Sequence, residues 1–119
     1  MNIETLQAYC LTKKGSEESL PFGPDTLVFK VGGKIFLLAS LNAIPFQFNI
    51  KCKPEVAVML REQYAAVQPG YHMNKQHWNT IIVDGTVKEK LLREWIDDSY
   101  GLVFKSLPKK MQQEIDSGL

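Results

Sequence analysis

The sequence predicts a single-domain α+β fold, an antiparallel sheet with helices packed on one face. The first observation is a β-hairpin. Thr26–Val31 and Lys34–Ser40 are rich in β-branched and aromatic residues, and Gly32-Gly33 between them supplies the positive φ angles of a two-residue turn. The second observation is strict alternation in Phe46–Lys53, which predicts a strand with one buried face. Consecutive strands joined by short turns must be antiparallel.

The third observation is helical spacing of apolar residues on both sides of these strands. Residues 2–13 predict a helix with Asn2 as its N-cap and Gly15 as its stop. A second helix begins with Pro54 in its first turn, where the missing N–H costs nothing, and runs to about Ala66. Helices therefore both precede and follow the hairpin.

Two further helices and two further strands complete the predicted order. The longest helical pattern covers 88–105, and a short, mostly polar helix over 108–115 is expected to pack at an edge. Trp78–Val83 predicts a strand, and the short segment Ser19–Phe22 precedes the hairpin. The order is α-β-β-β-β-α-β(β)-α-α, with one sheet face left relatively open. The helix residues expected to face inward are Ile3, Leu6, Tyr9, Cys10, Val56, Met59, Leu60, Gln63 or Tyr64, Leu91, Leu92, Trp95, Ile96, Ser99 or Tyr100, and Val103.

Size and composition place the chain among soluble globular domains. Its 119 residues are too few for two independent cores. Apolar residues make up 45% and charged residues 23%, which argues against disorder and against a coiled coil. No apolar run approaches the roughly 20 residues that cross a bilayer, and no secretory signal is visible. Cys10 and Cys52 lack CxxC spacing, which favours reduced thiols and a cytoplasmic location.

Charge is distributed unevenly along the chain. Residues 1–29 carry two basic and four acidic side chains, residues 30–80 carry six and two, and residues 81–119 carry six and seven. The segment charges are −2, +4 and −1, which agree with the net charge of +1. The basic middle of the chain also holds both histidines. This distribution is a mild electrostatic indication of an anionic partner.

Four lysines of the middle segment stand at predicted strand ends. Lys30 and Lys34 flank the hairpin tip, and Lys51 and Lys53 alternate along the third strand. Singly, each is typical of a solvated charge that protects a strand edge. If two hairpins lie side by side, the set forms a basic rim whose spacing suits phosphates.

The run from Pro69 to Thr80 holds more polar and aromatic side chains than a connector needs. Its two histidines, two asparagines, glutamine, lysine, tyrosine and tryptophan can hydrogen-bond base edges, bind phosphates and stack on bases, or stack on a small planar ligand. Trp78 is more often a core anchor at the start of a strand, and Asn and His also cap turns. The candidate DNA contacts in this run are His72, Asn74, Lys75, His77 and Asn79.

The sequence carries no signature of catalysis or of a resident metal. It lacks the GxSxG, P-loop, GxGxxG and HExxH patterns. His72 and His77 are five residues apart, the wrong spacing for one helix face, and their run holds no Cys or carboxylate, so no zinc site is expected. Cys52 falls on the apolar side of its strand, where a thiol is inert. We expect neither an enzyme nor a cofactor.

Two of these segments together resemble the small bacterial MmcQ/YjbR family. They are Pro21–Lys34, with the sequence PFGPDTLVFKVGGK, and Pro69–Thr80, with the sequence PGYHMNKQHWNT. The similar pattern runs from the first helix to Leu107–Lys110, nearly the whole chain. Gln76 stands where the family more often has a basic residue, which removes one candidate phosphate contact.

The resemblance implies a CyaY-like α+β fold with a double-wing surface that has been proposed to bind DNA. CyaY-type proteins bind iron through an acidic first helix and edge strand. That property is not carried over, because the helix over 2–13 holds Glu4 as its only acidic residue.

Three functions remain open at this stage. The leading hypothesis is a DNA-binding protein, with or without a regulatory role, whose lysine-bearing wings contact the phosphate backbone. The net charge of only +1 favours instead a non-enzymatic protein-interaction module that uses the open sheet face. A small-ligand site around His72, His77 and Asn79 is the third alternative. A monomer is the simplest expectation for the oligomeric state.

Overall fold

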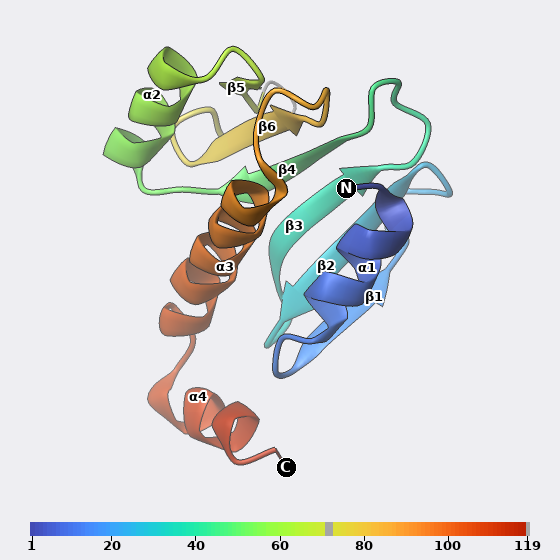
Figure 1. The fold of residues 1–119 in the computed structure, drawn as a ribbon. Helices are drawn as coiled ribbons and strands as arrows, with labels where there is room; N and C mark the ends of the chain where they lie inside the picture. Colours follow the sequence, from blue (N-terminus) through green and yellow to red (C-terminus); the bar gives the residue numbers. More distant parts are fainter. Residues whose placement is uncertain (71–72, 119) are drawn as a thin grey trace.

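The elements of the computed structural model, which describes residues 1–70 and 73–118, follow the predicted order (Figure 1). Within these residues one six-stranded sheet has the order β1-β2-β3-β4-β6-β5, and each neighbouring pair is antiparallel. None of the helices in this part of the chain has the length and apolarity to cross a bilayer. The α+β fold class is confirmed. The elements are α1 (Ile3–Leu11), β1 (Ser16–Ser19), β2 (Thr26–Val31), β3 (Lys34–Ser40), β4 (Gln47–Lys51), α2 (Pro54–Gln63), β5 (Val67–Pro69), β6 (Trp78–Ile82), α3 (Glu89–Lys105) and α4 (Lys109–Asp116).

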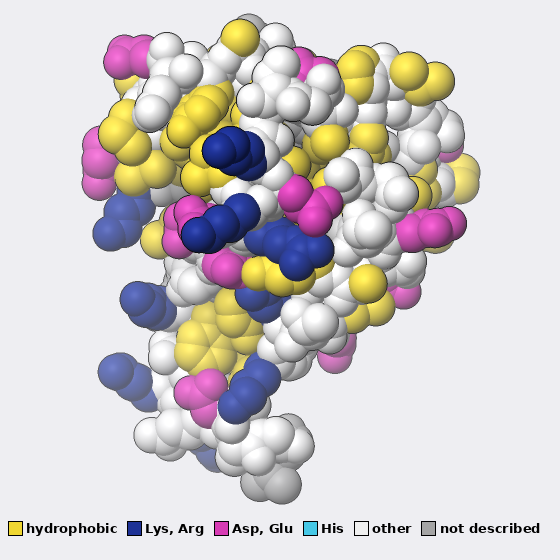
Figure 2. Space-filling model, in the orientation of Figure 1, with side chains coloured by type: hydrophobic (Ala, Val, Ile, Leu, Met, Phe, Trp, Pro, Cys, Tyr) yellow, Lys and Arg dark blue, Asp and Glu magenta, His cyan; other side chains and the backbone are white. Residues whose placement is uncertain are grey.

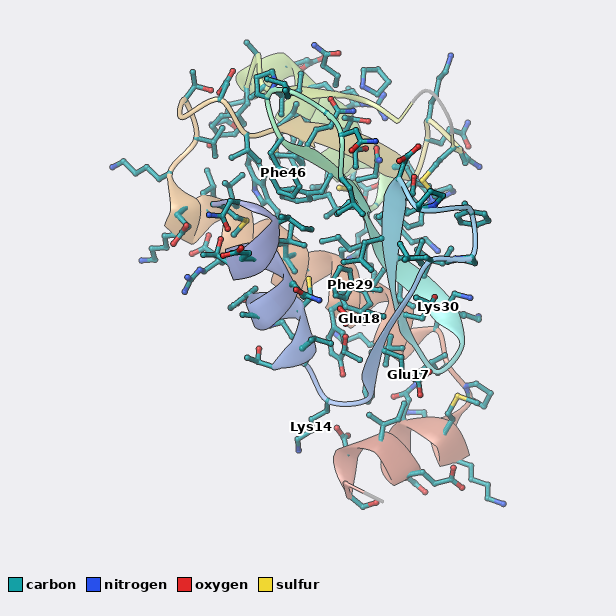
Figure 3. All side chains as sticks on the ribbon, turned by 90° about the vertical axis from the view of Figure 1, so that its right-hand side faces the viewer. Lys14, Glu17, Glu18, Phe29, Lys30 and Phe46 are labelled. Atoms are coloured by element: carbon teal, nitrogen blue, oxygen red, sulfur yellow. The ribbon has the colours of Figure 1, made fainter. Side chains whose placement is uncertain are left out.

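The main core lies between the sheet and the helices α1, α2 and α3. Figure 3 views the sheet nearly edge-on and shows α1 and α3 on one side of it, as predicted. Apolar residues from these helices meet alternate residues of β2, β3, β4 and β6. The fully or almost fully buried members include Leu6, Cys10, Phe29, Phe36, Phe48, Ile50, Ala57, Leu60, Ile81, Leu92, Trp95, Ile96 and Val103.

The predicted turn residues and the predicted helix cap are found at their expected positions. Gly32 and Gly33 have φ angles of 57° and 80°, so the β2–β3 hairpin uses the two positive-φ positions that favour glycine. Asn2 caps α1 in a capping box with Thr5, in which each backbone N–H donates to the other's side-chain oxygen at 2.9 Å. Both β2 and β3 have the predicted bounds.

Two short strands differ from the prediction because they lack an apolar pattern. The first strand is Ser16–Ser19 rather than Ser19–Phe22, and its polar side chains are mostly exposed. As an edge strand it pairs with β2 alone, so the backbone register rather than side-chain burial defines it. Val67–Pro69, where the sequence predicts a turn, pairs with β6 as the opposite edge.

The second helix is shorter than predicted and is turned slightly from the expected face. It ends at Gln63 because Tyr64 takes an extended backbone, with φ −126° and ψ 121°. Its buried residues are Ala57 and Leu60, whereas Met59 is 51% exposed instead of buried. The turn that follows brings the chain to β5, where the carbonyl of Ala66 accepts the N–H of Ile82 at 2.8 Å.

A β-bulge and one serine set the shape of the sheet at the β3–β4 seam. Phe29 faces Leu37 but Lys30 faces Ile35, so Phe36 is the extra residue of β3. The hydroxyl of Ser99, a wholly buried residue of α3, donates to the carbonyl of Phe36 at 2.6 Å and accepts the N–H of Lys51 at 2.8 Å. Ser99 thus replaces a direct strand–strand bond, and beyond it β3 and β4 run apart (Figure 1).

Replacing Ser99 by alanine should lower the free energy of unfolding by about 1–3 kcal/mol, because a buried carbonyl and a buried N–H lose their partner together. Urea denaturation measures the change. The matched control is Ser106→Ala, whose hydroxyl also donates to a carbonyl of α3 but at the exposed helix end. That variant should stay within about 0.5 kcal/mol of wild type, and equal losses for the two serines would contradict the bridging role.

Candidate nucleic-acid interface

The strand register brings two hairpin tips to the same end of the sheet. Gly32-Gly33 joins β2 to β3, and residues 70–77 join β5 to β6. β4 lies between the two hairpins in the sheet and finishes at the same end of the strands, with Lys51 opposite Trp78. We call this end of the sheet the lysine end. The sequence-predicted basic residues that belong to it are Lys30, Lys34, Lys51, Lys53 and Lys75.

The first hairpin tip is supported by the C-terminal part of the chain. A Cβ atom added at Gly32 would lie 2.6 Å from Leu107 Cδ1 and 2.7 Å from Met111 Sδ, so the tip packs closely against the start of α4. Gly33 faces open space. The β2–β3 hairpin, one of the predicted wings, therefore packs against Leu107 and α4 at its tip. Lys34, next to the tip, is exposed.

The second basic pair does not stand on a hairpin. β4 ends at Lys51 and leads directly into α2, for which Lys53 is the exposed N-cap residue. The second hairpin at this end is β5–β6, and its connection carries Lys75. Lys51 and Lys53 thus fill the interval between two hairpins rather than forming the tip of one.

Lys30 lies on the open face of the sheet. In Figure 3, Phe29 points toward α1 while Lys30 points to the opposite side, as alternation along β2 requires. Its partner in the register on β1 is Glu17, a carboxylate that reduces the positive potential there. Lys30 therefore contributes less to an anion site than Lys34.

Much of the connection before β6 serves to build its own turn. The side-chain oxygen of Asn74 accepts the N–H of Gln76 at 2.9 Å, and the Asn74 carbonyl accepts the N–H groups of His77 and Trp78. The carbonyl of His77 accepts the N–H of Cys52 at 2.7 Å, which ties the turn to the end of β4. Asn74, Lys75 and Gln76 are exposed and His77 is half-buried. His72, also predicted as a contact, lies outside the described residues.

The structure excludes Asn79 as a surface contact, which corrects the prediction. Its side chain is 0% exposed, because alternation along β6 turns it with Ile81 toward the helices. Its amide donates to the carbonyl of Ala57 at 3.2 Å, and its side-chain oxygen accepts Arg61 Nε at 2.7 Å. Asn79 is a buried link between β6 and α2.

Arg61 is the residue of this region that sequence reasoning missed. Besides the bond to Asn79, its guanidinium donates to the carbonyl of Lys75 and, at 3.4 Å, to that of Trp78. One side chain of α2 thus holds both the turn before β6 and the buried amide of β6. In the sequence the only signal was its membership in the basic segment.

Trp78 is buried, but not in the main core. It is 8% exposed and packs with Val28 and Leu38 in a second cluster on the open face, flanked by Ile35 and Met73. A hollow of about 370 Å³ adjoins this cluster. Its lining residues are Phe22, Thr26, Ile35, Leu38, Ser40, Asn49 and Met73, of which Phe22 is 65% exposed.

The fold brings further lysines to the lysine end from the segment 81–119, whose net charge is −1. α3 ends at the lysine end, and α4 begins against the hairpin tip, so both bring basic residues of the nominally acidic segment 81–119 to this edge. Figure 2 shows lysine and arginine side chains along the lower part of α3 and around α4, and further ones higher on the same face among acidic side chains. The residues added are Lys105, Lys109 and Lys110.

The opposite end of the sheet carries carboxylates. Asp25 precedes β2, Asp84 follows β6, and Glu89 opens α3, where it pairs with the N-terminal amine of Met1 at 3.3 Å. Lys88, Lys90 and Arg93 lie at this end too, so it carries charges of both signs.

The two thiols are buried and unpaired. Burial raises the pKa of Cys10 to about 12 and the pKa of Cys52 to about 11. Among residues 1–70 and 73–118, no three His, Cys, Asp or Glu side chains are grouped so that they could hold a metal ion.

The comparison with known proteins assigns the family. The family model YjbR matches residues 11–102. The chain belongs to the YjbR family. This confirms the family resemblance seen in Pro21–Lys34 and Pro69–Thr80. In this YjbR family member the matched region runs from the end of α1 to the last turns of α3.

Relatives and solved structures agree with that assignment over nearly the full length. The uncharacterized protein YbdF of Escherichia coli O157:H7 is 40% identical across 97% of this chain and 94% of its own length. The uncharacterized protein YjbR of Escherichia coli K12 is 30% identical across 95% and 96%. A crystal structure of a Deinococcus radiodurans protein with the domain DUF419 superposes with a TM-score of 0.92 at 36% identity, covering 97% of this chain and 88% of that one. A Pseudomonas syringae protein superposes with a TM-score of 0.75 at 27% identity, covering 87% and 99%.

Replacing Arg61 by alanine should loosen the turn before β6 and leave the side-chain oxygen of Asn79 without its donor. Hydrogen exchange of the N–H groups of Gln76, His77 and Trp78 should become faster, and stability should fall by about 1–3 kcal/mol because the vacated acceptor is buried. Arg93→Ala is the control. It removes an exposed pair with Glu89, worth at most about 1 kcal/mol, and should leave exchange in the turn unchanged.

The thiol pKa values predict slow alkylation and a loss of stability at high pH. Burial favours the neutral thiol in the folded state, so the unfolded chain loses its thiol protons first as pH rises above about 9. The stabilising contribution is present below that pH and disappears toward pH 11–12. At pH 8 the folded protein should react with iodoacetamide far more slowly than the urea-unfolded chain. Equal rates would show that burial does not protect the thiols.

Proposed function

We propose that this YjbR family member binds DNA through the lysine end of the sheet. The observation that carries the proposal is that lysines from separate segments occur at one end of the sheet, at both hairpin tips and in the interval between them. Phosphate groups along a duplex are evenly spaced anions, and lysines along an edge of this kind match them without reading the base sequence. The contacts assigned to phosphates are Lys30, Lys34, Lys51, Lys53 and Lys75, with Lys105, Lys109 and Lys110 as additional candidates.

We assign base readout to the turn before β6. Among the described residues of this turn, Asn74 and Gln76 are exposed and His77 is half-buried, and all three lie within two residues of Lys75. The side-chain oxygen of Asn74 already accepts a backbone N–H, so its amide nitrogen is the group assigned to a base edge. Phosphate contacts supply most of the affinity in this arrangement, and sequence preference is modest.

Fluorescence anisotropy of a labelled DNA duplex, titrated from about 50 to 200 mM salt, tests the proposal. Wild type should bind with a steep salt dependence. The double variant Lys34→Ala/Lys75→Ala should bind more weakly, and the slope of log K against log salt should become shallower by about one for each lysine–phosphate pair that the variant removes.

The matched control is Lys88→Ala/Lys90→Ala, which removes the same charge from exposed residues at the opposite end of the sheet. It should bind like wild type. No binding by the wild-type protein at about 50 mM salt, or equal weakening in the two double variants, would defeat the proposal.

The open-face hollow favours a second candidate, a protein-interaction module. Phe22 is 65% exposed beside an apolar hollow that also contains Met73 and Leu38, and such a side chain is typical of an interface anchor. A Phe22→Ser variant separates the two functions, since it should abolish capture of a protein partner and leave DNA affinity unchanged. The small-ligand alternative around the histidines has less support, because His77 lines neither this hollow nor the cavity between α2 and α3.

A further inference from the structure

A cavity of about 540 Å³ opens between α2, α3 and the end of β4, on the helix-covered side of the sheet. This volume is within the range of small-molecule sites. Its inner lining is apolar and almost entirely buried, formed by Ile50, Cys52, Leu60 and Trp95, while Val56 and Leu102 contribute partly exposed walls. Trp95 is held by an edge-to-face contact with Tyr64, at a ring distance of 5.2 Å, so the aromatic part of the lining is fixed.

Charged residues line the cavity unequally. Lys53, the N-cap of α2, and Lys105, in the last turn of α3, bring two lysines to one end of the lining. Lys51 also lines the cavity, but alternation along β4 turns its side chain away from Ile50 and toward the open face. Asp98 lies two turns earlier on α3, about 10 Å along the helix axis from Lys105. Asp97 also lines the cavity, but its carboxylate accepts the Tyr9 hydroxyl at 2.6 Å and pairs with Lys13, which follows α1. The lining thus has an excess of positive charge at the β4 end.

Gly101 leaves the α3 wall of this cavity open. It stands inside the 17-residue helix α3, where glycine is less favourable than alanine. Its backbone is not in the positive-φ region, and an added Cβ would meet nothing within 4 Å. Neither backbone geometry nor packing within the chain requires glycine here, and its absent side chain widens the cavity. The backbone of α3 is therefore accessible from the cavity at this position.

We infer that this cavity is a binding site for a small molecule with a flat apolar body and an anionic group, the body lying on Trp95 against Gly101 and the anion directed to Lys105 and Lys53. The site goes beyond DNA binding and does not rest on it. Lys53 and Lys105 are also assigned to phosphates, but the apolar lining is on the helix side of the sheet and the turn before β6 takes no part in it.

Titration with 2-naphthoate, followed by ¹H–¹⁵N NMR of the full chain, tests the site. The amide of Gly101 and the indole N–H of Trp95 should shift in a saturable way, while Leu38 and Met73 in the open-face hollow should not. The cation 2-naphthylmethylamine, with the same ring system, should bind more weakly. Shifts confined to the open face, no saturation at millimolar probe, or equal binding of the cation would overturn the inference.

Two variants locate the site and the charge. Gly101→Ala should keep or raise the melting temperature and yet weaken naphthoate binding, because the added methyl group occupies ligand space. Lys105→Glu should weaken naphthoate binding by about threefold or more, in line with the removal of a partly exposed ion pair. A lower melting temperature for Gly101→Ala would show that the fold itself needs the glycine, and unchanged binding in both variants would place the probe elsewhere. Either result refutes the site. Lys34→Ala/Lys75→Ala should bind naphthoate like wild type, so this inference and DNA binding fail separately.

Discussion

The hydroxyl of Ser99 is the point on which the arrangement of the molecule depends. It joins β3 to β4 where the bulge at Phe36 would otherwise leave a buried carbonyl and the N–H of Lys51 without partners. Because the bridge comes from a helix and not from a strand, the sheet divides beyond it. The β2–β3 hairpin turns toward α4, while β4 continues to α2 (Figure 1). The separation of the two hairpins and the cavity beside α3 both follow from this division.

How much of the fold could be predicted from the sequence depends on whether burial or only backbone pairing defines an element. Gly32-Gly33 and the alternation of Phe48 and Ile50 are local signals, and the structure follows them. Ser16–Ser19 and Val67–Pro69 are edge strands defined by their partners, and no periodicity marks them. Met59 was misplaced because the start of α2 sets the phase of the helix, and apolar spacing alone allowed neighbouring phases.

The candidate site was predictable in place but not in detail. The basic middle segment does come to one end of the sheet, yet the polar run before β6 has two roles that its composition could not separate. Asn74 closes a turn, and Asn79 is a buried amide that Arg61 and Ala57 satisfy. A buried polar group needs partners from elsewhere in the fold, and a sequence does not show which long-range partners exist. For the same reason Lys105, Lys109 and Lys110 were hidden in a segment whose summed charge is negative.

The lysines at one end of the sheet give that end a positive local potential despite a net charge of +1. In the field of a polyanion, an uneven charge distribution of this kind experiences a torque that turns the basic end toward the anion. At physiological ionic strength the field decays over about 8 Å, and reorientation is therefore confined to the final approach. For the same reason, retention on a cation exchanger should depend on where the lysines of this protein lie and not only on its net charge of +1.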